Sequence, residues 1–324
     1  MRKRSGWAGV VAALISLTVT ADYREHPEAQ AWLERVVARH DLSADEVRGL
    51  LASAQRQPAI LDAIARPVER TLAWHEYRAI FLTEERIRQG VEFARRHDEA
   101  LARAEERYGV PAPYILAILG VETSYGRNTG RHRVLDALAT LAFDYPPRGK
   151  FFGSELEQFL LLAREQGLDP LTLTGSYAGA MGYGQFIASS YRHYAVDFDG
   201  DGVADLFHSP VDAIGSIANY LARHDWRRGE PVAVPAAVTG RVDSAAWQGR
   251  LKPWVEVERL DRQGLRPAHR LDGEAEVAPL ALEGADGQEY WLGLHNFYAI
   301  SRYNHSVLYA MAVHQLAEAL EAEL

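Results

Sequence analysis

The amino-acid sequence predicts a mainly α-helical protein of the α+β class, with one small β-containing part. Apolar side chains recur at helical spacing through the N-terminal third, and one face of residues 83–108 carries Ile87, Val91, Ala94 and Leu101. After residue 225 this periodicity fades and prolines interrupt the chain. Residues 276–283 and 288–292 then resemble two strands around a hairpin signal at 284–287, before a last helical stretch.

Residues 1–21 are typical of an export signal. Arg2, Lys3 and Arg4 form a positively charged start, and residues 7–19 are apolar but too short to span a bilayer comfortably. Small residues up to Ala21 then suit cleavage. The alternative is an uncleaved N-terminal anchor. With cleavage, the mature protein would be exported and would begin just after residue 21.

Composition narrows the class of protein further. Of the 324 residues, 48% are hydrophobic and 24% charged, which is ordinary for a globular chain with room for two or three modules. The formal net charge of −9 argues against a nucleic-acid-binding protein, whose surface would be basic. The absence of cysteine excludes a thiol nucleophile and an acylated cysteine anchor.

Capping signals place the helices of the N-terminal third. Ser43 and Glu46 form a capping box, which opens a short helix. Thr83 heads one long helix, which is predicted to run to Tyr108 and to stop at Gly109. The region before residue 110 is therefore expected to be helical.

Three further helices are predicted downstream. Pro113 suits the first turn of an apolar helix that carries Ile115, Leu116, Ile118, Leu119 and Val121. Ser154 is expected to cap a helix that continues to about Glu165. The last helix is predicted to begin near Ser306, with apolar residues along one side.

Glu122 is the first candidate for chemistry. It follows the apolar run of residues 115–121 and is expected where that helix ends, with Gly126 just beyond. Apolar surroundings and the negative end of the helix dipole both disfavour a charged carboxylate. A carboxyl group that stays protonated near neutral pH can act as a general acid. The alternative is a structural glutamate paired with Arg127 or Arg131.

Residues 175–186 form a glycine-rich segment, which is the second candidate. Its four glycines leave little side-chain bulk, so a ligand can approach the backbone closely. Ser176, Tyr177, Tyr183 and Gln185 add hydroxyl, amide and flat apolar groups suited to sugars. The glycine spacing is not a dinucleotide fingerprint, because no strand precedes it. The alternative is a purely structural turn.

An acidic loop is the third candidate. Residues 197–202 match the first half of an EF-hand calcium loop, but position twelve is His208 and not the usual glutamate. An enlarged loop is therefore expected, with weak calcium affinity. The predicted ligands are the carboxylates of Asp197, Asp199, Asp201 and Asp212 and the carbonyl oxygen of Val203. The alternative is a solvated acidic turn.

In this order and spacing, the three segments resemble the membrane-bound lytic murein transglycosylase B family, glycoside hydrolase family 103. The similarity extends to residues 135–146, 212–220 and 296–306, and so covers nearly all of the mature chain. The resemblance implies a lysozyme-like core flanked by a helical and a small β-containing domain. The expected parts are a signal peptide over 1–21, a helical domain over 22–109 completed by residues 305–324, a core over 110–225 with its calcium loop at 197–212, and a β-containing domain over 226–304.

The resemblance also implies roles for individual residues. Glu122 matches the catalytic acid of the family. The residues expected to bind substrate are Ser176, Met181, Gln185, Tyr220, Tyr298, Arg302, Tyr303 and Arg148. Two departures affect this picture: Ile187 and Ala188 stand where the family usually has Met-Pro, and Pro147 replaces the first of a common arginine pair.

The implied activity is cleavage of peptidoglycan glycan strands by one carboxyl group, giving 1,6-anhydromuropeptides without water. Calcium is expected to be structural, with no organic cofactor. A soluble, periplasmic monomer with no nucleic-acid partner is expected. Two alternatives remain, namely a hydrolytic muramidase, which normally needs a second carboxyl group, and a calcium-dependent glycan-binding protein without activity.

Overall fold

The computed structural model describes residues 22–65, 72–247 and 249–324. The signal peptide predicted for residues 1–21 lies outside the described residues. In the described part of the chain, no helix has the length and apolar character needed to cross a membrane.

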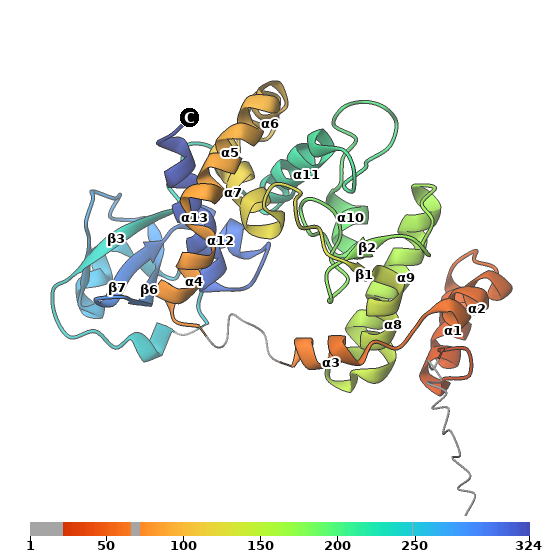
Figure 1. Ribbon diagram of the computed structural model, residues 1–324. Helices are drawn as coiled ribbons and strands as arrows, with labels where there is room; N and C mark the ends of the chain where they lie inside the picture. Colours follow the sequence, from red (N-terminus) through yellow and green to blue (C-terminus); the bar gives the residue numbers. More distant parts are fainter. Residues whose placement is uncertain (1–21, 66–71, 248) are drawn as a thin grey trace, which may run out of the picture.

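The helices expected as one domain over residues 22–109 divide between two places in the molecule (Figure 1). The first group comprises α1 (Pro27–Arg39), α2 (Ala44–Ser53) and α3 (Pro58–Ile64), near α8 (Val134–Asp144) and α9 (Gly149–Glu165). The second group comprises α4 (Trp74–Phe81), α5 (Glu84–Arg96) and α6 (Asp98–Tyr108), near α7 (Ala112–Thr123) and α13 (Val307–Glu321). The C-terminal helix therefore completes only the second group.

Two predicted helix boundaries are wrong. The long helix starting at Thr83 is two helices, because the backbone at His97 leaves the helical region with φ −129° and ψ 26°. Its end at Gly109 is confirmed, since Gly109 adopts the left-handed conformation with φ 75°. Helix α9 begins at Gly149 and not at Ser154. A Cβ on Gly149 would lie 2.8 Å from the Ala142 carbonyl oxygen, so glycine permits this early start.

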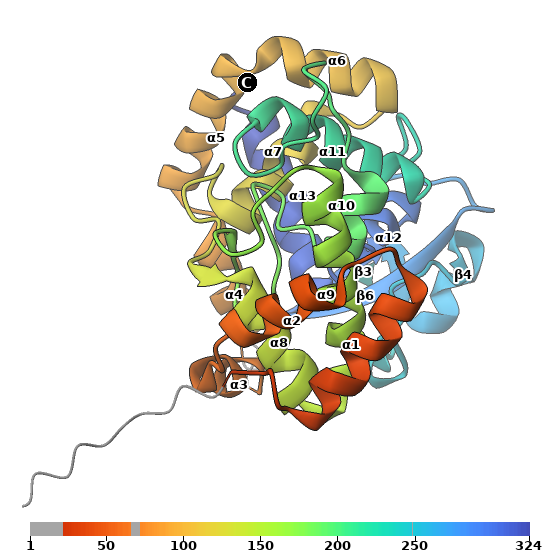
Figure 2. The ribbon, with the colours of Figure 1, turned by 90° about the vertical axis from the view of Figure 1, so that its right-hand side faces the viewer.

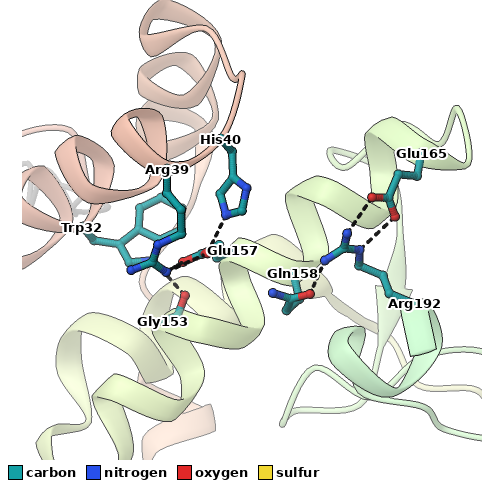
Figure 3. A network of polar contacts seen from close by, with 8 residues as sticks. All are labelled: Trp32, Arg39, His40, Gly153, Glu157, Gln158, Glu165 and Arg192. Atoms are coloured by element: carbon teal, nitrogen blue, oxygen red, sulfur yellow. Dashed lines mark hydrogen bonds and ion pairs between the residues drawn. The ribbon is translucent and has the colours of Figure 1, made fainter. Parts of the chain in front are cut away.

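Helix α9 is held on two sides by polar contacts (Figure 3). On one side, Arg39 and His40 at the end of α1 contact Glu157, with N–O distances of 3.0 and 2.7 Å. Glu157 is largely buried, and burying an unpaired carboxylate costs free energy, so these two contacts provide the partners that its charge needs. On the other side, Arg192 of α10 (Ala188–Tyr194) contacts both oxygens of Glu165. These contacts attach α9 to the end of α1 and to α10.

The β structure forms a small antiparallel sheet at one end of the molecule (Figure 1). The strand order is β4-β6-β7-β3-β5. The predicted hairpin is confirmed, because Gly284 pairs with Gly287 at the turn between β6 and β7. The strands are β3 (Ala233–Val238), β4 (Val255–Glu256), β5 (Leu265–Pro267), β6 (Glu276–Gly284) and β7 (Gly287–Gly293), and 3-10 helices η3 (Ser244–Trp247) and η4 (Val257–Gln263) lie between them.

A large apolar core joins the helices, and a smaller one lies under the sheet around Trp247, Leu260 and Leu292. The large core contains α13, which Figures 1 and 2 show among α4, α5, α7 and α12 (His295–Ser301). Helix α11 (Pro210–Arg223) packs on α6 and α7. The short strands β1 (His132–Arg133) and β2 (Thr174–Gly175) pair beside α8, while η2 (Pro146–Arg148) precedes α9.

Candidate active site

Glu122 lies in the last turn of α7, where the chain reverses sharply. Ser124, Tyr125 and Gly126 follow with φ values of 52°, 60° and 84°, so three consecutive residues adopt left-handed backbone conformations. Two non-glycine residues in this region store strain, which is typical of functional sites. The turn ends the helix at Thr123, one residue after Glu122, and leaves the side chain of Glu122 half-buried.

The glycine-rich segment is attached to this turn. The Thr123 hydroxyl donates to the Tyr183 carbonyl at 2.8 Å and accepts from the Gly126 N–H at 2.9 Å. A Cβ on Gly126 would lie 1.9 Å from Cε1 of Tyr183, so only glycine permits this approach. The close contact, together with the shared hydroxyl, sets the position of Glu122 relative to the segment.

Short β-bridges fold the glycine-rich segment back on itself. Met181 pairs with both Gly175 and Phe186, and its side chain is fully buried. Met181 therefore supports the segment from within the core and does not present its side chain to a ligand. Gln185 adopts a left-handed conformation with φ 50°, and its amide donates to the Thr129 carbonyl at 3.1 Å. The segment is thus tied at both ends to the loop after α7.

A cavity of about 560 Å³ opens between these two loops. Its lining residues are Glu122, Arg127, Asn128, Thr129, Gly130, Arg131, His132, Ser176, Tyr177 and Gln185. Of the described residues that line it, Glu122 alone carries a carboxyl group. The structure therefore brings Glu122 together with Ser176 and Gln185, although Glu122 lies more than 50 residues before either of them in the sequence.

The arginines that the sequence offered as partners for Glu122 line the same cavity. Arg127 forms an ion pair with Glu92, at 4.0 Å. A contact that the sequence did not predict reaches Glu122 from α13, where the Tyr309 hydroxyl donates to Oε1 at 2.7 Å. Tyr309 lies 187 residues away, and no local signal marks it out.

Tyr220 and Tyr303, two of the aromatic residues expected at the site, form a cluster next to the glycine-rich segment. Rings of Tyr220 and Tyr303 lie 4.7 Å apart, and the Tyr303 hydroxyl donates to the Gly184 carbonyl at 2.6 Å. The Tyr220 hydroxyl donates to the Arg302 carbonyl at 2.5 Å. Burial and, next, the charge of Glu122 raise the pKa of Tyr303 well above its usual value. These tyrosines support the glycine-rich segment, and the Tyr303 hydroxyl keeps its proton.

Two expected substrate-binding residues lie apart from this cavity. Arg148 stacks on the rings of Phe151 and Phe152, at 4.3 and 5.1 Å from their centres, near the start of α9. Tyr298 contacts Arg302 on α12, where the guanidinium lies 6.0 Å from the ring centre. Neither residue lines the 560 Å³ cavity around Glu122.

The acidic loop brings three of its aspartates together. Carboxylate oxygens of Asp197, Asp199 and Asp212 all lie within 4.8 Å of one another, whereas Asp201 is outside this group and its carboxylate accepts from the Val203 N–H at 2.9 Å. Asp212, at the start of α11, is buried and accepts from three backbone N–H groups of the loop. Burial raises the pKa of Asp212 although these hydrogen bonds lower it.

The start of α10 shows how one departure from the family pattern is accommodated. Helix α10 begins at Ala188, directly after Ile187, and neither residue supplies a side-chain cap. The buried Glu155 of α9 accepts from the Ser189 N–H at 2.9 Å instead. A distant carboxylate thus provides a hydrogen-bond acceptor for the first turn of α10.

A lone glutamate at the end of a buried helix, beside a glycine-rich wall of the cavity, defines a class of protein. This arrangement fits a glycan-cleaving enzyme on a mainly helical scaffold, because a single carboxyl group can act as a general acid. The comparisons with known proteins agree with this class.

The family model described as "Transglycosylase SLT domain" matches residues 24–318. The chain is 43% identical to the membrane-bound lytic murein transglycosylase B of Escherichia coli (strain K12) over 308 residues, which cover 92% of this chain and 84% of that protein. The structure is similar to the crystal structure of the soluble lytic transglycosylase SltB1 from Pseudomonas aeruginosa, with a TM-score of 0.86 and 48% identity over 92% of this chain and 99% of that one. It is also similar to the Escherichia coli lytic transglycosylase Slt35 in complex with calcium, with a TM-score of 0.85 and 43% identity over 92% and 94% of the two chains.

The chain belongs to the SLT transglycosylase family, and it is a lytic murein transglycosylase. The predicted fold class, a mainly helical protein with a lysozyme-like core and a small sheet, is confirmed. The enzyme acts on peptidoglycan, and the two alternatives, a hydrolytic muramidase and a binding protein without activity, are not favoured.

Proposed function

We propose that Glu122 is both the acid and the base of the transglycosylase reaction. The observation that carries this proposal is the cavity around Glu122, in which no other described lining residue has a carboxyl group. A hydrolytic mechanism ordinarily uses two carboxyl groups that flank the scissile bond. A lytic mechanism needs only one, because the nucleophile is a hydroxyl group of the substrate itself.

In the proposed reaction, protonated Glu122 donates its proton to the oxygen that links N-acetylmuramic acid to N-acetylglucosamine. The bond from that oxygen to C1 of the muramoyl sugar breaks, and the muramoyl acetamido group stabilises the positive charge that develops. The Glu122 carboxylate then accepts the proton of the C6 hydroxyl as O6 bonds to C1. This step closes the 1,6-anhydro ring and returns Glu122 to its protonated state.

Ser176 and Gln185 are proposed to contact the sugars on either side of this bond, since both line the cavity with Glu122. Tyr220, Tyr303 and Met181 are assigned to supporting positions, because their contacts are with the glycine-rich segment or with its neighbours. Arg148, Tyr298 and Arg302 lie outside this cavity and are proposed to contact more distant parts of the strand, such as a peptide stem.

We also propose that the acidic loop binds a structural calcium ion. Carboxylate oxygens are the ligands that calcium prefers, and three of them converge from Asp197, Asp199 and Asp212. Burying Asp212 beside two other carboxylates costs free energy unless a cation offsets their charges. The related Slt35 structure contains calcium, which supports this assignment. Asp201 and the Val203 carbonyl oxygen are proposed to complete the shell around the ion.

The remaining expectations concern the setting of the enzyme. We propose that it acts in the periplasm, as a monomer without a nucleic-acid partner, where its glycan substrate lies. We further propose that residues 110–225 form the catalytic unit and residues 226–304 the β-containing unit, with residues 22–109 and 305–324 packed around them.

Replacing Glu122 by glutamine tests the catalytic assignment. The amide keeps the shape but cannot deliver a proton, so turnover of isolated sacculi should fall by at least about 10³-fold, given that one general acid contributes roughly 10²–10⁴ and this group acts twice. The control is Glu106→Gln, which removes a charge from the exposed face of α6. Mass spectra of the released muropeptides should show the 1,6-anhydro form from the wild type and the control. Substantial turnover by Glu122→Gln with an unchanged melting temperature would place the acid elsewhere.

A further inference from the structure

The hydroxyl group of Tyr309 occupies a position that the proposed reaction does not yet use. It donates to Oε1 of Glu122 at 2.7 Å, and the Tyr309 side chain is only 2% exposed. Tyr309 lies in the first turn of α13, whose N-terminus is capped by Ser306, so its backbone position is fixed. The contact therefore joins the end of α7 to the start of α13 inside the core.

We propose that Tyr309 is a positioning residue for Glu122, which holds the carboxyl group in one orientation at the wall of the substrate cavity. This inference rests on the proposed role of Glu122 as the acid. A tyrosine hydroxyl that donates to Oε1 occupies that oxygen and restricts rotation of the carboxyl group.

The same hydrogen bond changes in strength during the reaction. When Glu122 loses its proton, Oε1 shares a full negative charge, and a hydrogen bond to a charged acceptor is roughly twice as strong as a neutral one. The bond thus stabilises the carboxylate that forms as the glycosidic bond breaks. It weakens again when the carboxylate accepts the proton of the C6 hydroxyl.

Tyr309 keeps its own proton throughout. Burial, and next the charge of Glu122, raise the pKa of Tyr309 well above its usual value. The residue therefore keeps its proton near neutral pH, remains a hydrogen-bond donor, and does not exchange protons with the substrate. Its effect reaches the reacting atoms only through Glu122.

The same pair of helices provides a matched control. Tyr114, at the start of α7, has its hydroxyl 3.0 Å from Nδ1 of His314 on α13. Both tyrosines are thus attached to the α7–α13 pair by one polar contact, but at opposite ends of α7. Phenylalanine at either position removes one hydroxyl and keeps the ring.

The experiment compares Tyr309→Phe with Tyr114→Phe, on purified full-length enzyme and isolated sacculi. We expect kcat of Tyr309→Phe to fall about 10- to 100-fold with little change in KM, because a hydrogen bond to a charged group is lost where charge develops. The basic limb of its pH–rate profile should move to higher pH, since the carboxylate form of Glu122 has lost a donor. Tyr114→Phe should keep the kcat and the pH profile of the wild type.

A second measurement does not depend on turnover. In protein with ¹³C-labelled glutamate carboxyl groups, the resonance that disappears in Glu122→Gln is that of Glu122, and its titration midpoint should be higher in Tyr309→Phe than in the wild type. Unchanged kcat and midpoint in Tyr309→Phe would overturn the positioning role and leave the role of Glu122 intact. Equal losses of kcat in both tyrosine variants would also overturn it, because they would show a purely structural contact. Full activity of Glu122→Gln would overturn both assignments.

Discussion

At the scale of single residues, the sequence around Glu122 indicates its role, whereas the sequence around Tyr309 contains no such indication. Glu122 could be found from its neighbours, because an apolar helical run precedes it and glycines follow it. Tyr309 is an ordinary helix residue in the sequence. Only the packing of α13 on α7 brings its hydroxyl to 2.7 Å from Oε1 of Glu122. A residue that acts through a distant partner leaves no pattern in its own segment.

Gly126 provides a test of how tightly the turn after Glu122 is constrained. Gly126→Ala should lower the free energy of unfolding by about 2 to 3 kcal/mol, because the new Cβ meets Tyr183 and the positive φ is unfavourable for alanine. Turnover should fall as well, since the turn positions Glu122. Urea denaturation and a sacculus assay measure the two effects.

The control for this change is Gly167→Ala. Gly167 also has a positive φ of 65°, but a Cβ at this position would have nothing within 4 Å of it. Gly167→Ala should therefore lower the free energy of unfolding only by the backbone cost of about 1 kcal/mol, and the variant should keep full activity. Equal effects of the two substitutions would mean that the contact with Tyr183 relaxes without cost.

At the scale of helices and loops, capping residues in the sequence predicted most helix ends. They did not predict the ends that are set by contacts with other helices. The caps at Ser43 and Thr83 and the stop at Gly109 are confirmed. The start of α10 depends on Glu155 from another helix, which no reading of the segment itself contains. A boundary is predictable when its hydrogen-bond partners lie within a few residues, and unpredictable when they do not.

The calcium loop can be tested as an element. At a hundredfold excess over its dissociation constant, calcium should raise the free energy of unfolding by about 2.7 kcal/mol, since it binds only the native state. Asp199→Asn removes one of the three converging carboxylates and should abolish most of this response. Melting curves with excess calcium and with a chelator measure it, while activity well below the melting temperature should largely persist.

The matched control is Asp286→Asn, which removes an equal charge from the exposed turn between β6 and β7. It should retain the full calcium response. A wild-type melting curve that does not change between excess calcium and chelator would show that the acidic loop is only a solvated turn.

Helix α13 should make stability depend on pH. Burial lowers the pKa of His314 to about 4, whereas a histidine in the unfolded chain has its usual pKa of 6.5. The unfolded state therefore binds more protons between these two pH values. The contribution of His314 to the free energy of unfolding is fully present above pH 6.5 and is lost as the pH falls towards 4. At pH 5 the loss from this one group amounts to about 2 kcal/mol relative to pH 7.

His314→Leu removes this titration and keeps an apolar side chain among Tyr114, Trp291 and Glu318. Urea denaturation at pH 7 and pH 5 should show a smaller difference for the variant than for the wild type. An identical difference in both proteins would mean that His314 is protonated in the folded state without penalty.

At the scale of the whole molecule, α13 connects the last residues of the chain to the helices around the site. It packs on α4, α5, α7 and α12, and Tyr309, Met311 and Leu316 are among its buried residues. The packing of α4, α5 and α7 therefore depends on a segment that lies far from them in the sequence.

Truncation tests this dependence. A chain that ends at residue 305 lacks α13 and should not unfold cooperatively, because the apolar faces of α4, α5 and α7 lose their partner. A chain that ends at residue 321 lacks only exposed residues and should melt like the wild type. Circular dichroism and calorimetry measure both. A cooperative transition in the shorter chain would show that the helices fold without α13.

The sequence by itself determined the helical class, the β hairpin, Glu122 and the acidic loop, because periodicity, caps and ligand spacing are local properties. It also predicted that Ser176 and Gln185 belong with Glu122, through its resemblance to a family. The tertiary structure decided that residues 22–109 divide into two groups, that Met181 is buried, and that Tyr309 contacts Glu122. These features depend on the packing of segments far apart in the chain, and the free energy of that packing is not encoded in any one segment.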